Sequence, residues 1–355
     1  MNFKKVYWGR FAGLLIALLV ILLTGCTGRQ AAKLNKYDKI YLDYFDTVTE
    51  ITVYTEREQQ FEQIAGDFEA ELQRYHQLYD IYHNYDGINN VKTINDNAGI
   101  TPVTVDRDII RLLRFAVEQH DKTGGKVNVA MGSVLSIWHN YREAGMMNLE
   151  GAQVPDLEQL MRANEHTDIH RIQIDVEKST VYLPDREMRL DVGAVAKGYA
   201  VQQIAAKMKK EGVTSALVSV GGNIQTIGMR GDGIPWRVGV QNPDTNADKA
   251  YLYALSLHDM ALVTSGSYQR YYDVGGVRYH HIINPDTLMP WNEYVSVTIL
   301  CPDSGVADVL STAIFNMPFQ QGAELIESMA DTEAMWVYPD GTEKYSSGFE
   351  VYIDE

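Results

Sequence analysis

The sequence predicts an α+β protein in which one large domain forms two lobes, with mixed sheets and packed helices. Residues 56–165 carry apolar side chains at helical spacing, and residues 170–337 consist mainly of short apolar runs separated by turn residues. Separation of helices and strands into different parts of a chain is typical of α+β folds. The sequence contains no internal repeat, no low-complexity tract and no clear interdomain linker.

The first half is predicted to begin with a strand over 40–54, which contains Phe45, Asp46 and Thr47. Helices are expected over 56–82, 106–123, 129–141 and 156–165, where apolar residues recur every three or four positions. Gly124 and Gly125 end the second of these helices. Residues 82–100 are polar and rich in asparagine, and they are expected to form a loop.

The second half is predicted to be mainly strands, with three helices among them. Strands are expected over 172–176, 180–183, 215–220, 236–241, 250–258, 261–264, 268–273, 277–283, 295–300 and 334–337. The helices are expected over 197–211, 306–316 and 319–329. Cys301 follows the apolar run that begins at residue 295, so it is interpreted as a buried core residue.

The N-terminus has the layout of an export signal. Basic residues in the first ten positions precede an apolar run over 11–23, which is too short to span a membrane comfortably. The run ends in Leu-Thr-Gly-Cys, which resembles the lipobox of bacterial lipoproteins. That resemblance implies cleavage before Cys26, acylation of Cys26, and attachment to the extracytoplasmic side of the cell membrane. The alternatives are an uncleaved anchor and a cysteine that follows a signal peptide by chance.

We therefore expect a signal peptide over 1–25, a lipid-anchored cysteine with a polar tether over 26–37, and a folded domain over 38–355. The composition limits the classes of molecule that this domain is expected to bind. A net charge of −16 excludes nucleic acid as an expected partner, because a phosphate backbone requires a basic protein face. Twenty-two tyrosines against nine phenylalanines indicate half-buried rings and a surface suited to stacking planar ligands.

The stretch over 190–200 predicts an anion-binding turn. A short apolar segment ends in Asp191, a glycine follows, and Lys197 begins a helix, whose free N–H groups and dipole attract negative charge. Asp191 is ill suited to a bare phosphate. It suits a sugar or ring hydroxyl, or a metal ion that itself holds phosphate. The alternative is an ordinary sharp corner between two elements.

Asp308 and Thr312 predict a magnesium site. Residues four apart on a helix share one face, and a carboxylate with a hydroxyl is an oxygen pair of the kind that Mg²⁺ prefers. Ser311 could add a third oxygen. The alternative is an acidic residue in the first helical turn, with a threonine that bonds to its own helix.

His280 and His281 end a predicted strand and precede a proline turn. Adjacent residues of a strand point to opposite faces, so we expect one of the two histidines in a site, where it could act as a general base. No His/Cys cluster has the spacing of zinc ligands, and the other seven histidines receive no role.

Five motifs in order resemble the FAD:protein FMN transferases, the ApbE family. They are the stretch after Asp191, Gly-Gly-Asn-Ile at 221–224, Thr-Ser-Gly-x-Tyr at 264–268, His-Ile-Ile-Asn-Pro at 281–285, and Ala-Asp-x-x-Ser-Thr-Ala at 307–313. The likeness extends from about residue 45 to 337. It implies the fold of that family, with FAD as substrate, Mg²⁺ as cofactor, and transfer of FMN to a threonine hydroxyl of an acceptor protein with release of AMP.

The resemblance also implies roles for individual residues. Metal ligands would be Asp308, Thr312, the Ala194 backbone oxygen and Ser311, and His281 would be the general base. Flavin and adenosine contacts would be Phe45, Tyr85, Lys126, Val127, Asn128, Asp191, Lys197 and Ile282. The expected acceptors are exported FMN-binding domains of redox or electron-transfer proteins.

Three departures from the family pattern stand out: Asn284 replaces an aspartate, Leu288 replaces a glycine, and the family often has an aspartate near Asn128. Loss of the charge at Asn284 is expected to lower metal affinity or the basicity of His281. Two other functions remain open. Water in place of threonine would make the protein an FAD pyrophosphatase, and a protein without turnover would be a flavin-binding lipoprotein. The Asp308 and Thr312 pair argues against the second, because a pure binder needs no metal on the diphosphate.

Overall fold

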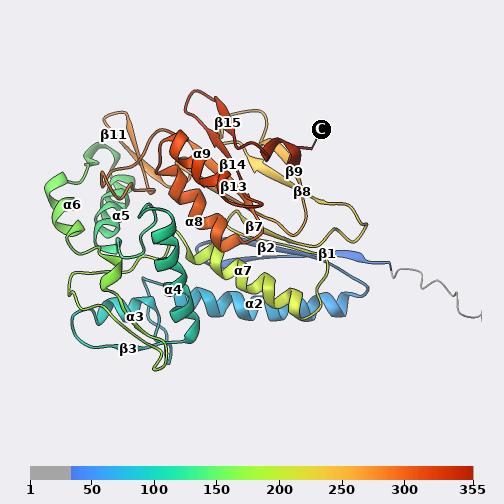
Figure 1. Cartoon of the computed structure of the whole chain (residues 1–355), viewed down its shortest axis with the longest axis horizontal. Coiled ribbons are helices and arrows are strands. Elements are labelled where there is room, and N and C mark those ends of the chain that lie inside the picture. Colours follow the sequence, from blue (N-terminus) through green and yellow to red (C-terminus); the bar gives the residue numbers. More distant parts are fainter. Residues whose placement is uncertain (1–32, 355) are drawn as a thin grey trace, which may run out of the picture.

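The computed structural model describes residues 33–354, in which eight strands form one antiparallel sheet (Figure 1). The strands lie in the order β1-β2-β6-β7-β10-β13-β14-β15, so segments from both ends of the chain share the sheet. Their bounds are Asn35–Tyr44, Thr47–Thr55, Ala216–Val220, Asn223–Ile227, Ala261–Gly266, Ser296–Cys301, Glu333–Val337 and Glu343–Tyr345. The predicted signal peptide and Cys26 lie outside the described residues. Residues 35–37, expected at the end of the tether, already pair with β2.

Four helices pack beside the sheet: α2 (Glu58–Tyr79), α7 (Ala196–Lys210), α8 (Ser304–Phe315) and α9 (Phe319–Glu327). A separate core contains the hairpin of β8 (Trp236–Gln241) and β9 (Tyr251–Leu257) together with a 3₁₀ turn at Phe349–Tyr352. In this core Trp236, Leu255 and Phe349 pack against sheet residues such as Leu300 and Met335. Apolar side chains are therefore buried on both faces of the sheet, and we call the sheet with these elements the first lobe.

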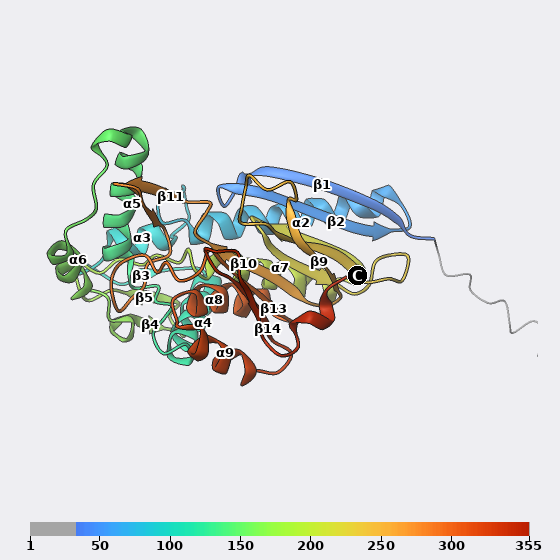
Figure 2. The same ribbon diagram turned by 90° about the horizontal axis from the view of Figure 1, so that it is seen from above.

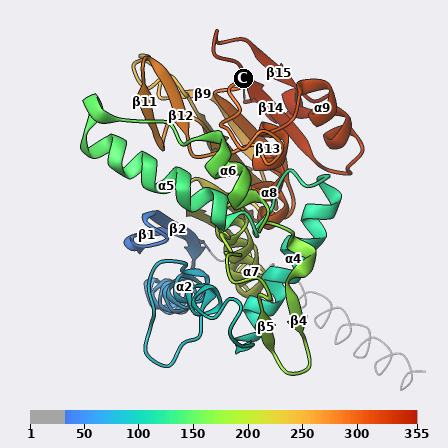
Figure 3. The same cartoon turned by 90° about the vertical axis from the view of Figure 1, so that its left-hand side faces the viewer.

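A second lobe lies at one end of the sheet (Figures 1 and 2). It contains α3 (Val91–Asp96), α4 (Arg107–Lys122), α5 (Gly132–Met147), α6 (Leu157–Asn164), and 3₁₀ turns at Leu149–Gly151 and Ile169–Arg171. Its short strands are β3 (Val103–Thr104), β4 (Gln173–Asp175), β5 (Thr180–Tyr182), β11 (Tyr271–Val274) and β12 (Val277–His280). Figure 3 views this end, where α5 runs between the β11–β12 hairpin and α2. A third core around Trp138 joins α5 to the chain that leaves β12.

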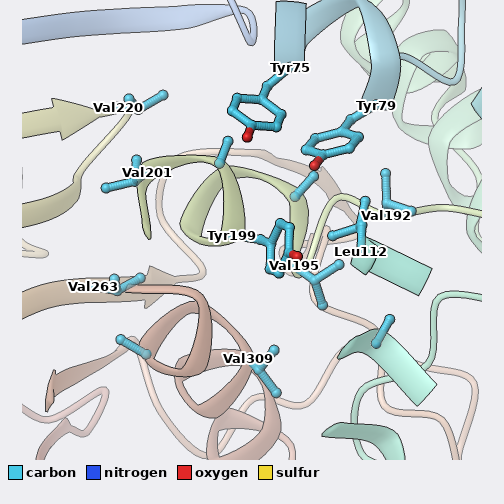
Figure 4. Close-up of a cluster of buried hydrophobic side chains, with 14 of the residues drawn as sticks. Tyr75, Tyr79, Leu112, Val192, Val195, Tyr199, Val201, Val220, Val263 and Val309 are labelled. Atoms are coloured by element: carbon cyan, nitrogen blue, oxygen red, sulfur yellow. The ribbon is translucent and has the colours of Figure 1, made fainter. Parts of the chain in front are cut away.

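Helix α7 is the centre of the main core (Figure 4). Tyr75 and Tyr79 of α2 pack on one side of it, and Val309 of α8 lies on the other. Its own residues Val201 and Ile204 are almost fully buried. Packing on several sides therefore fixes the position of α7 and of the turn that precedes it.

The expected strand over 40–54 is wrong in one respect, because it is a hairpin of two strands. Phe45 and Asp46 form its two-residue turn, with φ of 53° and 50°. Turns of this kind require left-handed backbone at both positions, which glycine or asparagine usually supplies. An aromatic residue in this conformation gives no turn signal in the sequence.

The loop expected over 82–100 contains the short helix α3. Asn90 caps it, because its Oδ1 accepts a hydrogen bond from the Thr93 backbone N–H at 3.0 Å. Three strands were also missed, namely the two-residue β3, β7 and β15. Gly221 and Gly222, with φ of 56° and 87°, form the turn of a β6–β7 hairpin, and β15 pairs with β14.

The other predicted helices and strands are present with shifted ends, the largest shift being in α5, which ends at Met147 rather than near residue 141. The observed combination of packed helices with several sheets confirms the expected α+β fold class. Among residues 33–354, no helix is both long enough and apolar enough to cross a membrane.

Candidate functional site

A cavity of about 580 Å³ is lined by residues of both lobes. All five sequence motifs contribute to it, through Asp191 and Lys197, Gly221 and Asn223, Thr264 to Gly266, His281 to Ile283 with Pro285, and Asp308 with Thr312. The cavity size falls in the range of small-molecule sites. Of the predicted site residues within the described part of the chain, only Ser311 does not line it. The predicted lipidation site Cys26 lies outside that part.

One corner of the cavity is rich in oxygen atoms. Asp308 and Thr312 project from α8, and the Ser265 hydroxyl at the end of β10 lies 3.4 Å from the Thr312 hydroxyl. Ser311 is fully buried; its hydroxyl donates to the Asp308 carbonyl at 2.9 Å and lies 2.8 Å from the Ser265 hydroxyl. We therefore assign Ser311 to holding Ser265 and remove it from the candidate metal ligands.

The start of α7 meets α8 at this corner. The Gly198 N–H donates to Asp308 Oδ2 at 2.8 Å, and a Cβ at residue 198 would lie 2.3 Å from the Asp308 Cβ. In a regular helical turn this N–H would bond to the Ala194 carbonyl. Among the described residues, that carbonyl accepts no hydrogen bond. The geometry therefore leaves a backbone oxygen of the turn available near the Asp308 carboxylate.

Asp308 is an unusual carboxylate because it is buried. Burial raises its pKa above the ordinary value, while Lys197, the Gly198 N–H and Asn223 oppose that shift. Burial likewise raises the pKa of Asp191, whose Oδ1 accepts a hydrogen bond from the Gly193 N–H at 2.9 Å. A cation in the cavity would stabilise the charged form of both groups.

The two adjacent histidines have different surroundings. His280 is buried, donates from Nε2 to the Trp291 carbonyl at 3.1 Å, and accepts the Ile282 N–H at Nδ1. His281 lines the cavity, and its Nδ1 has no hydrogen-bond partner among the described residues. Of the two histidines, therefore, only His281 lines the cavity.

His281 is neutral at pH 7. Burial lowers its pKa to about 3. The charges of Arg270, Arg142 and Lys197 act in the same direction, as does His280 when it is protonated. A neutral imidazole with an unpaired ring nitrogen can accept a proton. An anion bound among those positive charges would raise the pKa of His281 and so make it a stronger base.

An aromatic wall lies on the α2 side of the cavity. The Phe45 N–H donates to His76 Nδ1 at 3.2 Å, His76 Nε2 lies 3.3 Å from the Tyr85 hydroxyl, and Tyr85 donates to Asp80 at 2.7 Å. Burial and the hydrogen bond to Asp80 raise the pKa of Tyr85 to about 12. This series of hydrogen bonds holds the rings of Phe45 and Tyr85 in place along the cavity wall.

Another part of the cavity wall is formed by the loop that follows the Gly124 and Gly125 turn. Lys126 forms an ion pair with Asp286, which ties this loop to the turn after His281. Asn128 donates from Nδ2 to the Thr167 carbonyl and accepts the Ala130 N–H at Oδ1, each at 2.8 Å. Its amide thus has a structural role that uses both a donor and an acceptor, which an ionised aspartate could not fill.

The sequence did not reveal several polar residues of the cavity, namely His76, Asp80, His139, Arg142 and Arg270. Arg142 lies one helical turn after His139 on α5, and its guanidinium lies 2.9 Å from His139 Nδ1. Burial lowers the pKa of Arg142, which nevertheless stays charged at pH 7. With Arg270 it makes this side of the cavity positive. In the sequence, His139 and Arg142 were only two polar residues three positions apart on one predicted helix face.

The structure also locates the two remaining departures from the family pattern. Asn284 is buried and does not line the cavity; its Nδ2 donates to the Asn316 carbonyl, and its Oδ1 accepts two backbone N–H groups of the following turn. Leu288 has φ of 59°, a conformation that favours glycine, yet its side chain is buried in the third core. Both departures therefore lie in the scaffold rather than in the cavity wall.

Comparison with known proteins agrees with the family resemblance of the five sequence motifs. The family model described as "ApbE family" matches residues 45–336. A relative from Treponema pallidum named FAD:protein FMN transferase is 32% identical over 369 residues, covering 98% of this chain and 96% of its own length. Another of that name, from Klebsiella pneumoniae, is 30% identical over 274 residues, covering 76% of this chain and 82% of its own length.

Solved structures agree with this assignment. The crystal structure of the ApbE protein from Thermotoga maritima matches with a TM-score of 0.78 at 27% identity, over 90% of this chain and all of its own. The flavin transferase ApbE of Vibrio cholerae has the same fold, with a TM-score of 0.74 at 23% identity, over 90% of this chain and 99% of its own. The chain belongs to the ApbE family of flavin transferases.

Proposed function

We propose that this protein transfers the FMN half of FAD to a threonine hydroxyl of an acceptor protein and releases AMP, in a Mg²⁺-dependent reaction. The relatives named FAD:protein FMN transferase support the overall activity. The observation that carries the finer proposal is the meeting, in one cavity, of an oxygen-only corner at Asp308 and Thr312 with the neutral His281.

The oxygen-rich corner fits a magnesium ion. Its available donors are a buried carboxylate, a hydroxyl and the Ala194 carbonyl, which are the hard oxygen ligands that Mg²⁺ prefers, and waters or phosphate oxygens can fill the other positions. Mg²⁺ held there would neutralise charge on the diphosphate and on the leaving AMP.

The remaining groups bind and position the substrates. Helix α7 begins without a side-chain cap, so its N-terminus and Lys197 can hold phosphate oxygens, and Arg142 and Arg270 add positive charge. Phe45 and Tyr85 offer ring faces to the planar parts of FAD. His281 takes the proton of the acceptor hydroxyl, whose oxygen forms a bond to the FMN phosphorus while the bond from that phosphorus to AMP breaks.

We further propose that the protein acts outside the cytoplasm, anchored through Cys26, on exported FMN-binding domains of redox proteins. The Leu-Thr-Gly-Cys sequence after the apolar run supports the anchor. The net charge of −16 argues against nucleic acid as a partner of the protein.

The decisive experiment incubates residues 27–355 with FAD, Mg²⁺ and an exported FMN-binding domain. Mass spectrometry of the acceptor and quantitation of AMP are then compared. An acceptor heavier by one FMN, with an equal amount of AMP, supports the transferase. AMP with an unmodified acceptor would favour the pyrophosphatase, and a failure to release AMP with any acceptor would leave a flavin-binding protein.

A further inference from the structure

We propose that His120, Asp121 and His170 form a second metal site, which binds a divalent transition metal such as Zn²⁺ outside the flavin cavity. His120 and Asp121 lie in the last turn of α4, and His170 lies in the 3₁₀ turn at Ile169–Arg171. One ligand atom from each residue lies within 4.8 Å of the other two. His120 and Asp121 are neighbours in sequence, and His170 lies 50 positions after His120, so only folding brings the three together.

A hydrogen bond to the backbone fixes the tautomer of the His120 imidazole. Its Nδ1 lies 3.0 Å from the Val127 carbonyl, and since a carbonyl only accepts, Nδ1 carries the hydrogen. The lone pair is therefore on Nε2. A hydrogen bond from the second ring nitrogen to a carbonyl is the usual support of a metal-bound histidine, because it fixes both the tautomer and the ring orientation.

The other two ligands face this ring. His170 Nε2 lies 3.3 Å from Asp121 Oδ1, and the two imidazole rings meet edge to face with centroids 5.6 Å apart. The side chains of Asp121 and His170 are each 58% exposed, so they can close around an ion without disturbing the core. Water can occupy the remaining positions.

The donor set selects the class of metal. Two imidazole nitrogens and one carboxylate oxygen suit Zn²⁺, Cu²⁺ or Ni²⁺, whereas Mg²⁺ prefers oxygen ligands alone. The C-terminal end of α4 adds a favourable field, because the last carbonyls of a helix carry partial negative charge. The site thus differs in chemistry from the oxygen-rich corner at Asp308.

A metal here would stiffen one wall of the flavin cavity. Val127 accepts the hydrogen bond from His120 and lines the cavity, and Asn128 beside it donates to the Thr167 carbonyl, three residues before His170. The ion would therefore join α4 and the 3₁₀ turn at the base of the loop over 126–128. Its binding does not depend on the proposed FMN transfer.

The test is calorimetric titration of the EDTA-treated full chain in detergent with ZnCl₂, in excess Mg²⁺ to fill oxygen sites. We expect one equivalent of zinc to bind, and His170→Ala to weaken this binding by at least about tenfold. His258→Ala removes another exposed histidine and should change nothing. Equal zinc affinity in wild type and His170→Ala, or no zinc binding by the wild type, would overturn the proposal.

Hydrogen exchange tests the link to the cavity wall with a readout other than activity. Zinc should slow exchange of the backbone amides at 126–130 in the wild type and leave them unchanged in His170→Ala. The Asp121→Asn variant keeps the size of the side chain and should also lose tight binding. Zinc-independent exchange at 126–130 in a wild-type protein that binds zinc would refute the stiffening of the loop.

Discussion

The Gly198 N–H donates to Asp308 Oδ2 at 2.8 Å, across the contact between α7 and α8. The bond can form because residue 198 has no side chain, so the two helices approach until their backbones nearly touch. It also frees the Ala194 carbonyl from its usual helical partner. One glycine thus positions the carboxylate and the carbonyl that we propose as metal ligands.

Gly198→Ala should separate these helices. The new Cβ would lie 2.3 Å from the Asp308 Cβ and 2.4 Å from the Ser304 carbonyl oxygen. The free energy of unfolding should therefore fall by about 1–3 kcal/mol. Mg²⁺-dependent turnover should also fall strongly, because the proposed metal ligands move apart. Gly66→Ala, at an exposed position of α2 where nothing lies within 4 Å, is the matched control and should stabilise the protein slightly. Urea unfolding and AMP release measure the two effects; equal behaviour of both variants would refute the close-contact argument.

Asp308→Asn should raise the Mg²⁺ concentration needed for half-maximal AMP release by at least about tenfold, because a charged ligand is lost while the Gly198 hydrogen bond can persist. Asp303→Asn makes the same change at the cap of α8, outside the cavity, where asparagine is an equally good cap. It should leave the Mg²⁺ dependence unaltered. Unchanged Mg²⁺ dependence in Asp308→Asn would remove this residue from the metal site.

His281→Ala should slow FMN transfer by about 10²–10⁴-fold, the usual cost of losing a general base, while FAD still binds. Single-turnover rates with saturating FAD, together with FAD affinity from fluorescence, separate the two effects. A variant that loses only FAD affinity would show that His281 binds substrate rather than accepting the proton.

Acid should destabilise the protein through His280. Its folded pKa of about 4 lies below the ordinary 6.5, so the unfolded chain takes up the proton first and stability is lost as pH falls from about 6.5 towards 4. Between pH 7 and 4.5 the loss is about 2 kcal/mol for this one group. His280→Gln cannot titrate, so its unfolding free energy, measured by urea at several pH values, should fall less than that of the wild type. Parallel pH profiles would contradict the role of His280.

Asn284→Asp should destabilise the fold without changing the metal site. The Nδ2 hydrogen bond to the Asn316 carbonyl is lost and a buried carboxylate faces that carbonyl, which costs about 1–3 kcal/mol. The Mg²⁺ dependence of AMP release should not change, because residue 284 does not line the cavity. A higher Mg²⁺ affinity in this variant would restore the idea that the missing charge tunes the metal.

Much of the first lobe could be predicted because its signals are local. Helix α2 buries Phe61, Phe68, Leu72 and Tyr75 on one side, and that spacing is visible in the sequence. Strand β7 was missed for the opposite reason. Its residues Asn223, Gln225 and Thr226 are polar, and they are buried between β6 and β10, so their pattern is not that of an apolar strand.

The same limit applies to the cavity. The motifs at Asp191, His281 and Asp308 could be recognised one by one, since each is a short run of residues. His76, Arg142 and Arg270 carried no such signal, because each is an ordinary polar residue until another element packs opposite it. The two histidines of the proposed second metal site, among those that received no role, belong to the same class.

The sequence by itself determined the helices and strands with regular apolar spacing, the family, and the residues of each motif, because these depend on neighbours along the chain. Only the tertiary structure decided that His281 rather than His280 faces the cavity, that Ser311 supports Ser265, and that Gly198 brings Asp308 to the Ala194 carbonyl. Each of these depends on the distance between side chains far apart in sequence, and packing sets that distance.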